Sequence, residues 1–228
     1  MNRQAPARTP TRKEDLMKLA VVGAAGRTGR LVVDLALAAG HTVTAVARTP
    51  ARLPEFTHGT PLTAQADVHR PGSLREPLTG QDAVVSTLGT TGRSATTVFS
   101  DGARELVSAA TGSGGSPHLV AMSSAGLESG HLPFAQRVVT RLVVDRLYRE
   151  IHHDLARMEE VLTESDTIWT VVRAPMLRDG PPSPDPRVSY DRPLPGAGTA
   201  TRATVAAWIV RHLGAPETFR RRVALTDN

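Results

Sequence analysis

Short apolar runs and apolar repeats of helical spacing alternate along most of the chain. The run from Leu19 to Val22 predicts a buried strand, and the apolar positions between Leu31 and Leu37 predict a helix directly after it. The same pattern predicts further strands at 41–47, 61–67, 82–88, 118–122, 167–173 and 222–225, and helices at 73–80, 97–110, 134–164 and 203–213. Strands that alternate with helices imply a parallel sheet covered on both faces. We therefore expect an α/β fold, a Rossmann-like doubly wound parallel sheet.

Three residues at the ends of these predicted helices are of types that cap helices. Gly40 follows the first helix, where glycine readily takes the left-handed conformation that ends a helix. Ser73 and Thr201 precede later helices and can accept hydrogen bonds from first-turn N–H groups.

Two segments fall outside the alternation. Residues 1–15 are rich in proline and arginine, and we expect them to form a disordered basic tail. The proline-rich stretch 181–195 has no regular period, and we expect a small flap on the substrate side over about 178–200. The remaining residues, 16–228, are predicted to form one Rossmann-like domain.

Composition narrows the classes of function. Hydrophobic residues make up 40% and charged residues 21%, as in ordinary globular proteins. The absence of cysteine excludes thiolate catalysis, and no apolar run approaches the length of a membrane helix, so we expect a cytoplasmic protein with no membrane partner. The net charge of +5 comes from scattered arginines without an aromatic stripe, and we expect no nucleic-acid partner. No histidine spacing of the metal-ligand type is present, so no metal is expected.

A glycine-rich turn joins the first predicted strand to the first predicted helix. Its sequence, GAAGRTG at 23–29, lies where unpaired N–H groups and the positive end of the helix dipole favour an anion. The pattern predicts a pyrophosphate site, and the alternative is a tight structural turn. The candidate phosphate-binding residues are Gly23, Ala25, Gly26, Arg27, Thr28 and Gly29.

The end of the second predicted strand indicates which dinucleotide binds. An acidic residue there binds the ribose 2′-hydroxyl of NAD, whereas an arginine accommodates the 2′-phosphate of NADP. The strand ends at Arg48 with no acid in reach, so we expect NADP(H), although a solvated charge is the alternative. Asp67 and Val68 close the third strand, where the adenine edge would lie; Asp67 could equally form a turn.

Several segments together resemble the atypical short-chain dehydrogenases/reductases. The closest branch is the NAD(P)H-binding proteins similar to flavin reductase, biliverdin reductase B and the NmrA-like proteins. The resemblance covers about residues 17–225 and rests on GAAGRTG at 23–29, Arg48, Asp67-Val68, SSAG at 123–126, DLARME at 154–159 and WTVVRAP at 169–175. It implies a monomer or weak homodimer that acts on a small-molecule substrate. It also implies a nicotinamide site flanked by Leu88, Gly89, Ser123, Ser124, Pro175, Met176 and Leu177.

The chain departs from this group in the catalytic pair. Classical members use a Tyr-x-x-x-Lys pair, and by register with residues 154–159 the two positions are Ile151 and Leu155. Both lysines of the chain, Lys13 and Lys18, precede the glycine turn. The Tyr/Lys mechanism is therefore excluded.

Three other side chains are candidates for polarising a substrate or donating a proton. Ser124 follows a strand and could project over the nicotinamide, although it could instead cap the backbone. Tyr148 and His152 are four residues apart, so they share a helix face and could form a donor pair or an exposed surface. His131 could enter the site from a loop.

These residues favour an NADPH-dependent oxidoreductase that reduces a small conjugated carbonyl, quinone or flavin-like substrate. Such delocalised acceptors need only a nearby nicotinamide and a weak proton donor. Two alternatives stay open on the same fold. One is an NmrA-like NADP(H) sensor without catalysis, and the other is a non-redox isomerase, dehydratase or cyclase.

Overall fold

The computed structural model describes residues 16–90, 92, 95–112, 114–127, 146–196 and 198–227, without the side chains of 146 and 147. Over these residues the chain forms one eight-stranded sheet in the order β3-β2-β1-β4-β5-β6-β10-β8. Its strands are β1 (Lys18–Val22), β2 (Thr42–Ala47), β3 (Leu62–Gln65), β4 (Ala83–Ser86), β5 (His118–Ser124), β6 (Ile168–Ala174), β8 (Arg187–Tyr190) and β10 (Arg221–Thr226). Every pairing is parallel except that of β10 with β8. The predicted Rossmann-like doubly wound sheet is confirmed.

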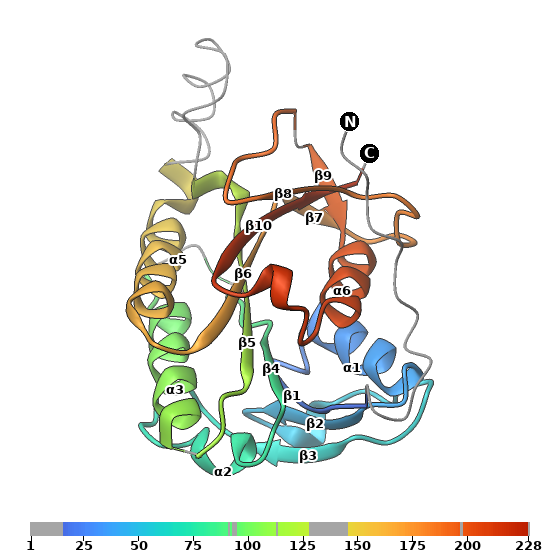
Figure 1. The fold of residues 1–228 in the computed structure, drawn as a ribbon, viewed down its shortest axis with the longest axis vertical. Coiled ribbons are helices and arrows are strands. Elements are labelled where there is room, and N and C mark those ends of the chain that lie inside the picture. Colours follow the sequence, from blue (N-terminus) through green and yellow to red (C-terminus); the bar gives the residue numbers. More distant parts are fainter. Residues whose placement is uncertain are drawn as a thin grey trace.

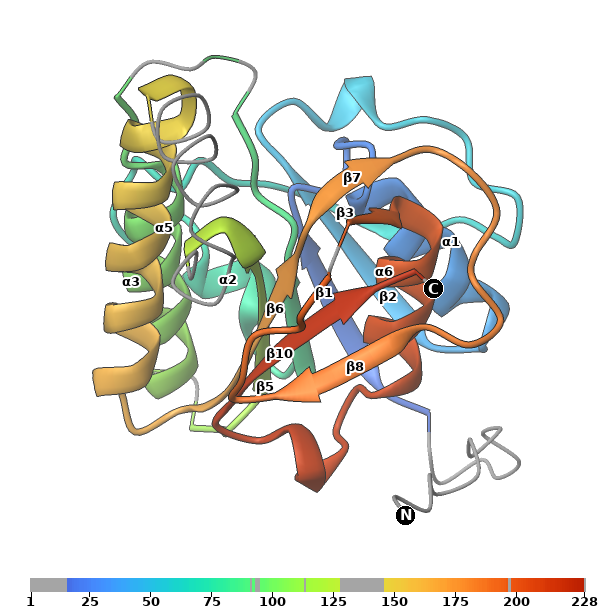
Figure 2. The same cartoon turned by 90° about the horizontal axis from the view of Figure 1, so that it is seen from above.

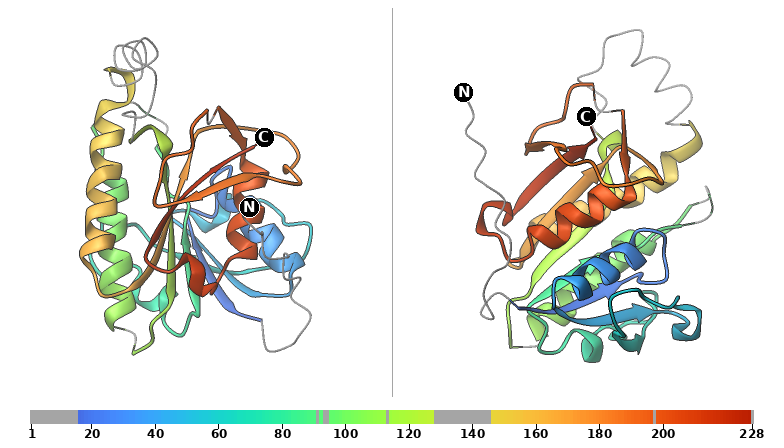
Figure 3. Two further views of the ribbon diagram at one scale, coloured as in Figure 1. Left: turned by 45° about the horizontal axis from the view of Figure 1, so that its top comes forward. Right: turned by 90° about the vertical axis from the view of Figure 1, so that its right-hand side faces the viewer.

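Helices cover both faces of this sheet because its central strands are apolar on both sides. In β1, Leu19 and Val21 pack toward α1 (Gly29–Ala38) and α6 (Arg202–Arg211), whereas Ala20 and Val22 pack toward the opposite layer. That layer contains α2 (Arg75–Leu78), α3 (Val98–Gly112) and α5 (Arg146–Glu164). Figure 1 and Figure 2 show α3 and α5 on one side of the sheet and α1 and α6 on the other. Figure 3 shows α1 and α6 side by side.

Two of the three predicted caps are confirmed. Gly40 takes a positive φ of 85°, and the N–H groups of Gly40 and His41 donate to the carbonyls of Leu37 and Ala36, which closes α1. Thr201 caps α6, since its hydroxyl accepts from the N–H of Thr204 at 3.0 Å. The prediction for Ser73 was wrong: α2 begins at Arg75, and the Ser73 hydroxyl instead donates to the carbonyl of Asp67.

The C-terminal third contains more regular structure than its pattern predicts. Strand β8 lies inside the proline-rich stretch 181–195 and pairs antiparallel with β10, so it extends the main sheet as an edge strand. Two short strands, β7 (Met176–Arg178) and β9 (Thr199–Thr201), form a separate parallel pair. These strands escape the pattern because they are short and lie among prolines and glycines, which predict turns rather than strands.

Some predictions fall outside the described residues. They are the basic tail 1–15, His131 and the part of the predicted long helix before Arg146. None of the described helices is both long and apolar enough to cross a membrane.

His118 is a buried histidine at the start of β5. Its Nδ1 accepts from the Gly214 N–H at 3.1 Å, and its Nε2 lies 2.7 Å from Thr170 Oγ1. The Thr170 hydroxyl donates to the carbonyl of Thr218, so the proton of the neutral imidazole lies on Nε2. Burial lowers the pKa of His118 to about 4, because a charged ring here would lose its solvation.

We expect this histidine to make the fold sensitive to acid. The unfolded chain binds a proton at His118 near pH 6.5 but the folded chain only near pH 4, so stability is full above pH 6.5 and is lost as pH falls toward 4. The contribution is about 3 kcal/mol at most. Denaturant unfolding between pH 7 and 4 measures it, and His118→Gln should flatten the slope. A ring titration by NMR with a midpoint near 6.5 would contradict the prediction.

Candidate functional site

The glycine turn between β1 and α1 is held tightly by its neighbours. The N–H groups of Gly23 and Ala24 donate to the carbonyl of Val46 in β2. The Thr87 hydroxyl, after β4, lies 3.1 Å from the Val22 carbonyl and 3.2 Å from the Gly23 carbonyl. Contacts from β2 and from Thr87, which follows β4, therefore hold the turn on both sides of β1.

Two positions of this turn, 23 and 29, require glycine. A Cβ added to Gly29 would lie 2.3 Å from the Gly23 carbonyl oxygen and 2.6 Å from Thr87 Oγ1. Gly23 itself has a φ of 85°, a conformation that side chains other than glycine disfavour. Any larger residue at position 29 would push the turn away from Thr87.

Four backbone N–H groups of the turn make no hydrogen bond to other described residues. They belong to Ala25, Arg27, Thr28 and Gly29, at the N-terminus of α1. Unpaired donors at a helix N-terminus form an anion site, and the glycines leave room for a phosphate to approach the backbone. These features fit the diphosphate of a dinucleotide. The turn also follows β1, where the strand order reverses between β1 and β4, which is the usual ligand position in such sheets.

Arg48 and Asp67 lie beyond the turn, at the carboxyl ends of β2 and β3. Arg48 is exposed, its side chain makes no ion pair with another described residue, and its carbonyl accepts from Gln65 Nε2. Asp67 holds a turn: its carboxylate accepts from the His69 N–H, and its carbonyl accepts from the Arg70 N–H. Val68, next to it, is buried. The turn-forming role of Asp67 is therefore observed, and its contact with adenine stays a prediction.

The two serines that end β5 have different surroundings. The Ser123 hydroxyl donates to Glu159 Oε1 at 2.6 Å inside the protein, on the side of α5. Ser124 Oγ lies 3.4 Å from His152 Nε2 and accepts from the Gly126 N–H at 3.1 Å. The Tyr148 ring stacks near His152, with centroids 6.4 Å apart. The structure thus brings together Ser124, His152 and Tyr148, the three residues predicted to be catalytic.

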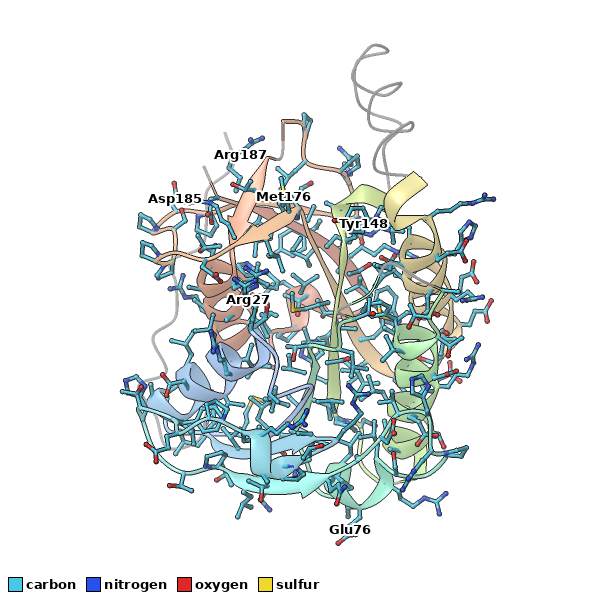
Figure 4. All side chains as sticks on the ribbon, turned by 180° about the vertical axis from the view of Figure 1, so that it is seen from behind. Arg27, Glu76, Tyr148, Met176, Asp185 and Arg187 are labelled. Atoms are coloured by element: carbon cyan, nitrogen blue, oxygen red, sulfur yellow. The ribbon has the colours of Figure 1, made fainter. Side chains whose placement is uncertain are left out.

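The remaining predicted nicotinamide residues lie after β4 and β6. Leu88 is half-buried and packs against Gly102 of α3, while Gly89 is exposed with open space around its Cα. Pro175 and Leu177 are half-buried, and Met176 is 73% exposed. Figure 4 shows Met176 and Tyr148 toward the same end of the molecule and Arg27 beneath Met176.

Comparison with known families identifies this arrangement. The model of the NAD(P)H-binding family matches residues 23–216, from the first glycine of the turn to the end of the sheet's last crossover. The chain belongs to the NAD(P)H-binding family. This family assignment agrees with the resemblance inferred from the glycine turn and the strand-end motifs.

Solved structures share the fold of this NAD(P)H-binding chain. An oxidoreductase from Lactococcus lactis is 17% identical, with a TM-score of 0.76 over 93% of this chain and 91% of that one. A short-chain dehydrogenase/reductase from Veillonella parvula in complex with NADP is 22% identical, with a TM-score of 0.75 over 92% and 94%. A candidate NADH-flavin reductase from Streptococcus pneumoniae is 20% identical, with a TM-score of 0.71 over 93% and 100%. At these identities the likeness shows the fold.

Two buried carboxylates of the DLARME segment connect α5 to the elements around the end of β5. Asp154 is fully buried and accepts from the Phe99 N–H at 2.9 Å and the Ser100 hydroxyl at 2.5 Å, so it caps α3 from α5. Glu159 accepts from Ser123, Arg173 and Arg222, which belong to β5, β6 and β10. Acidic residues at apolar-stripe positions of a predicted helix are seldom buried without partners, and this was the sequence signal that could have indicated their role.

Thr87 and Asp179 were also missed. Thr87 is a hydroxyl residue at the carboxyl end of a buried strand, a position that could have been assigned to the glycine turn. Asp179 binds Arg27 of the turn from a segment with no clear period. Among the described residues no group of three or more histidines and carboxylates could hold a metal ion.

Proposed function

We propose that this protein is an NADPH-dependent oxidoreductase that reduces a small conjugated carbonyl, quinone or flavin-like substrate without a Tyr-x-x-x-Lys pair. Bound NADPH would supply the hydride, and the chain would hold the dinucleotide, orient the acceptor and donate a proton. Family membership supports the dinucleotide, and the residues at the end of β5 support the chemistry.

The preference for NADP(H) rests on Arg48. Its exposed guanidinium stands at the carboxyl end of β2, where a 2′-phosphate would be recognised, and no carboxylate takes that position in the sequence. We expect tighter binding of NADPH than of NADH in a fluorescence titration. Equal affinity for the two would contradict this preference.

The observation that carries the proposed reaction is the contact between Ser124 Oγ and His152 Nε2. With the imidazole proton on Nε2, the Ser124 oxygen accepts from both His152 and the Gly126 N–H. The serine hydroxyl hydrogen is then directed to a third partner, which we assign to the substrate oxygen. His152 would replace the proton through Ser124, and the 3.4 Å separation would shorten in the substrate complex.

NADPH oxidation with a panel of quinones, flavins and enones tests this function. We expect turnover by the wild-type protein and about a 100-fold lower kcat for Ser124→Ala and His152→Gln, because they remove the proton donor. The Kd for NADPH should stay unchanged in both variants. His153→Gln changes the exposed neighbouring histidine and should leave kcat unaltered. Tight NADPH binding without turnover on any acceptor would contradict an enzyme and favour a sensor.

A further inference from the structure

One carboxylate joins the glycine turn to the C-terminal part of the protein. Asp179 follows β7, and its Oδ2 pairs with Nη2 of Arg27, while its Oδ1 lies 3.1 Å from Arg202 Nη1. Arg27 belongs to the turn before α1, and Arg202 is the first residue of α6. Three segments that are far apart in sequence therefore meet at Asp179.

This bridge stands at the middle of the sheet's carboxyl edge. The order β2-β1-β4-β5-β6 puts Arg48 on one side of the glycine turn and the Ser124 region on the other. A dinucleotide that reaches both ends must place its diphosphate at the turn, next to Arg27. Figure 4 shows Arg27 in the middle of the molecule, beneath Met176 of β7.

The C-terminal side of the bridge is well anchored. Asp227, after β10, accepts from Arg178 Nη2 at 3.1 Å, from the Thr201 N–H at 2.9 Å and from the Thr204 hydroxyl at 2.6 Å. These contacts fix β7 to the start of α6 on either side of the Asp179–Arg202 pair. The segment that carries Asp179 is therefore fixed, and any separation of Arg27 from Asp179 comes from movement of the glycine turn.

The charges suit a role with an anion better than a role in folding. Two guanidinium groups and one carboxylate leave a net charge of +1 beside the unpaired N–H groups of the turn. The Arg27 and Asp179 side chains are 59% and 63% exposed, and pairs this exposed contribute little to stability. Arg202, whose side chain is 15% exposed, is the least exposed of the three and holds Asp179 in place.

We propose that Asp179 is a positioning residue that holds Arg27 across the bound diphosphate and slows release of the dinucleotide. This inference rests on the proposed NADPH binding and adds to it a residue that positions Arg27. The carboxylate keeps Arg27 directed toward β7, so that its guanidinium is already in place for the phosphates when the dinucleotide binds, and losing this placement weakens the bound state.

Stopped-flow release of NADPH from the full chain tests the proposal. We expect Asp179→Asn to raise the dissociation rate about fivefold and to leave the association rate within about twofold, as for a lost positioning contact. The affinity for 2′,5′-ADP should not change, because this fragment lacks the second phosphate and the nicotinamide half. Arg27→Gln combined with Asp179→Asn should release NADPH no faster than Arg27→Gln alone, since both remove one interaction.

Two control variants separate this effect from others. Glu76→Gln removes one negative charge from an exposed site at the opposite end of the molecule and should change neither rate (Figure 4). Arg48→Ala should weaken both NADPH and 2′,5′-ADP. An unchanged release rate for Asp179→Asn would overturn the positioning role. A slower release would overturn it as well and would indicate that Asp179 competes with the phosphates. Binding without turnover overturns only the proposed reaction, whereas a wild type that binds no dinucleotide overturns both proposals.

Discussion

Replacing Gly29 with alanine is expected to weaken NADPH binding by about 100-fold, which corresponds to about 3 kcal/mol. The new methyl group would overlap the Gly23 carbonyl oxygen, at 2.3 Å, and Thr87 Oγ1, at 2.6 Å. The Gly23 carbonyl is backbone, and Thr87 Oγ1 is held by its hydrogen bonds to the Val22 and Gly23 carbonyls, so rotation of a flexible side chain cannot relieve the overlap. The turn must move, and its unpaired N–H groups move with it. A fluorescence titration of NADPH measures the loss.

Gly112→Ala is the matched control for this substitution. Gly112 is the last residue of α3, and a Cβ there meets no atom within 4 Å. Its affinity for NADPH should equal that of the wild type. Thr87→Ala combined with Gly29→Ala should recover only part of the affinity, because the overlap with the Gly23 carbonyl remains. Wild-type affinity in Gly29→Ala would show that phosphates do not bind at this turn.

The central strands and the main helices could be predicted because their burial sets a clear period. A short apolar run such as Leu19–Val22 is typical of a buried parallel strand when glycines follow it, and the spacing of those glycines restricts the turn. Strand β8 could not be predicted in this way. It is a four-residue edge strand among prolines, and its pairing with β10 depends on tertiary position.

The residues of the candidate site likewise fall into those that local sequence predicts and those that depend on tertiary packing. The glycine turn, Arg48 and Ser124 could be assigned from sequence because each follows a recognisable strand. The different roles of Ser123 and Ser124 could not, because both depend on partners from α5, whose packing against the end of β5 is not set by the local sequence. The contacts of Glu159 with β6 and β10, and of Asp179 with Arg27, depend on packing between distant segments.

Replacing Glu159 with methionine is expected to lower the free energy of unfolding by about 3 kcal/mol. Its carboxylate is 5% exposed and accepts four hydrogen bonds from Ser123, Arg173 and Arg222. Without it, the guanidinium of Arg173, at 12% exposure, loses its acidic partner in a place that water reaches poorly. Arg222 is affected less, because its side chain is 37% exposed and can be solvated. Chemical denaturation at pH 7 measures the change.

A double substitution separates the effect of losing the Glu159–Arg173 ion pair from the effect of losing packing. Arg173→Met alone should destabilise less than Glu159→Met, because Glu159 keeps Arg222 and Ser123 as partners. Glu159→Met with Arg173→Met leaves two apolar side chains in contact and should cost less than Glu159→Met alone. Glu160→Ala, on the exposed face of the same helix, should change stability by less than about 0.5 kcal/mol. If the double variant lost as much free energy of unfolding as the two single variants together, the network would stabilise the protein through packing rather than through charge. In that case each member would be needed for the way α5 packs against β5 and β6, independently of its charged partner.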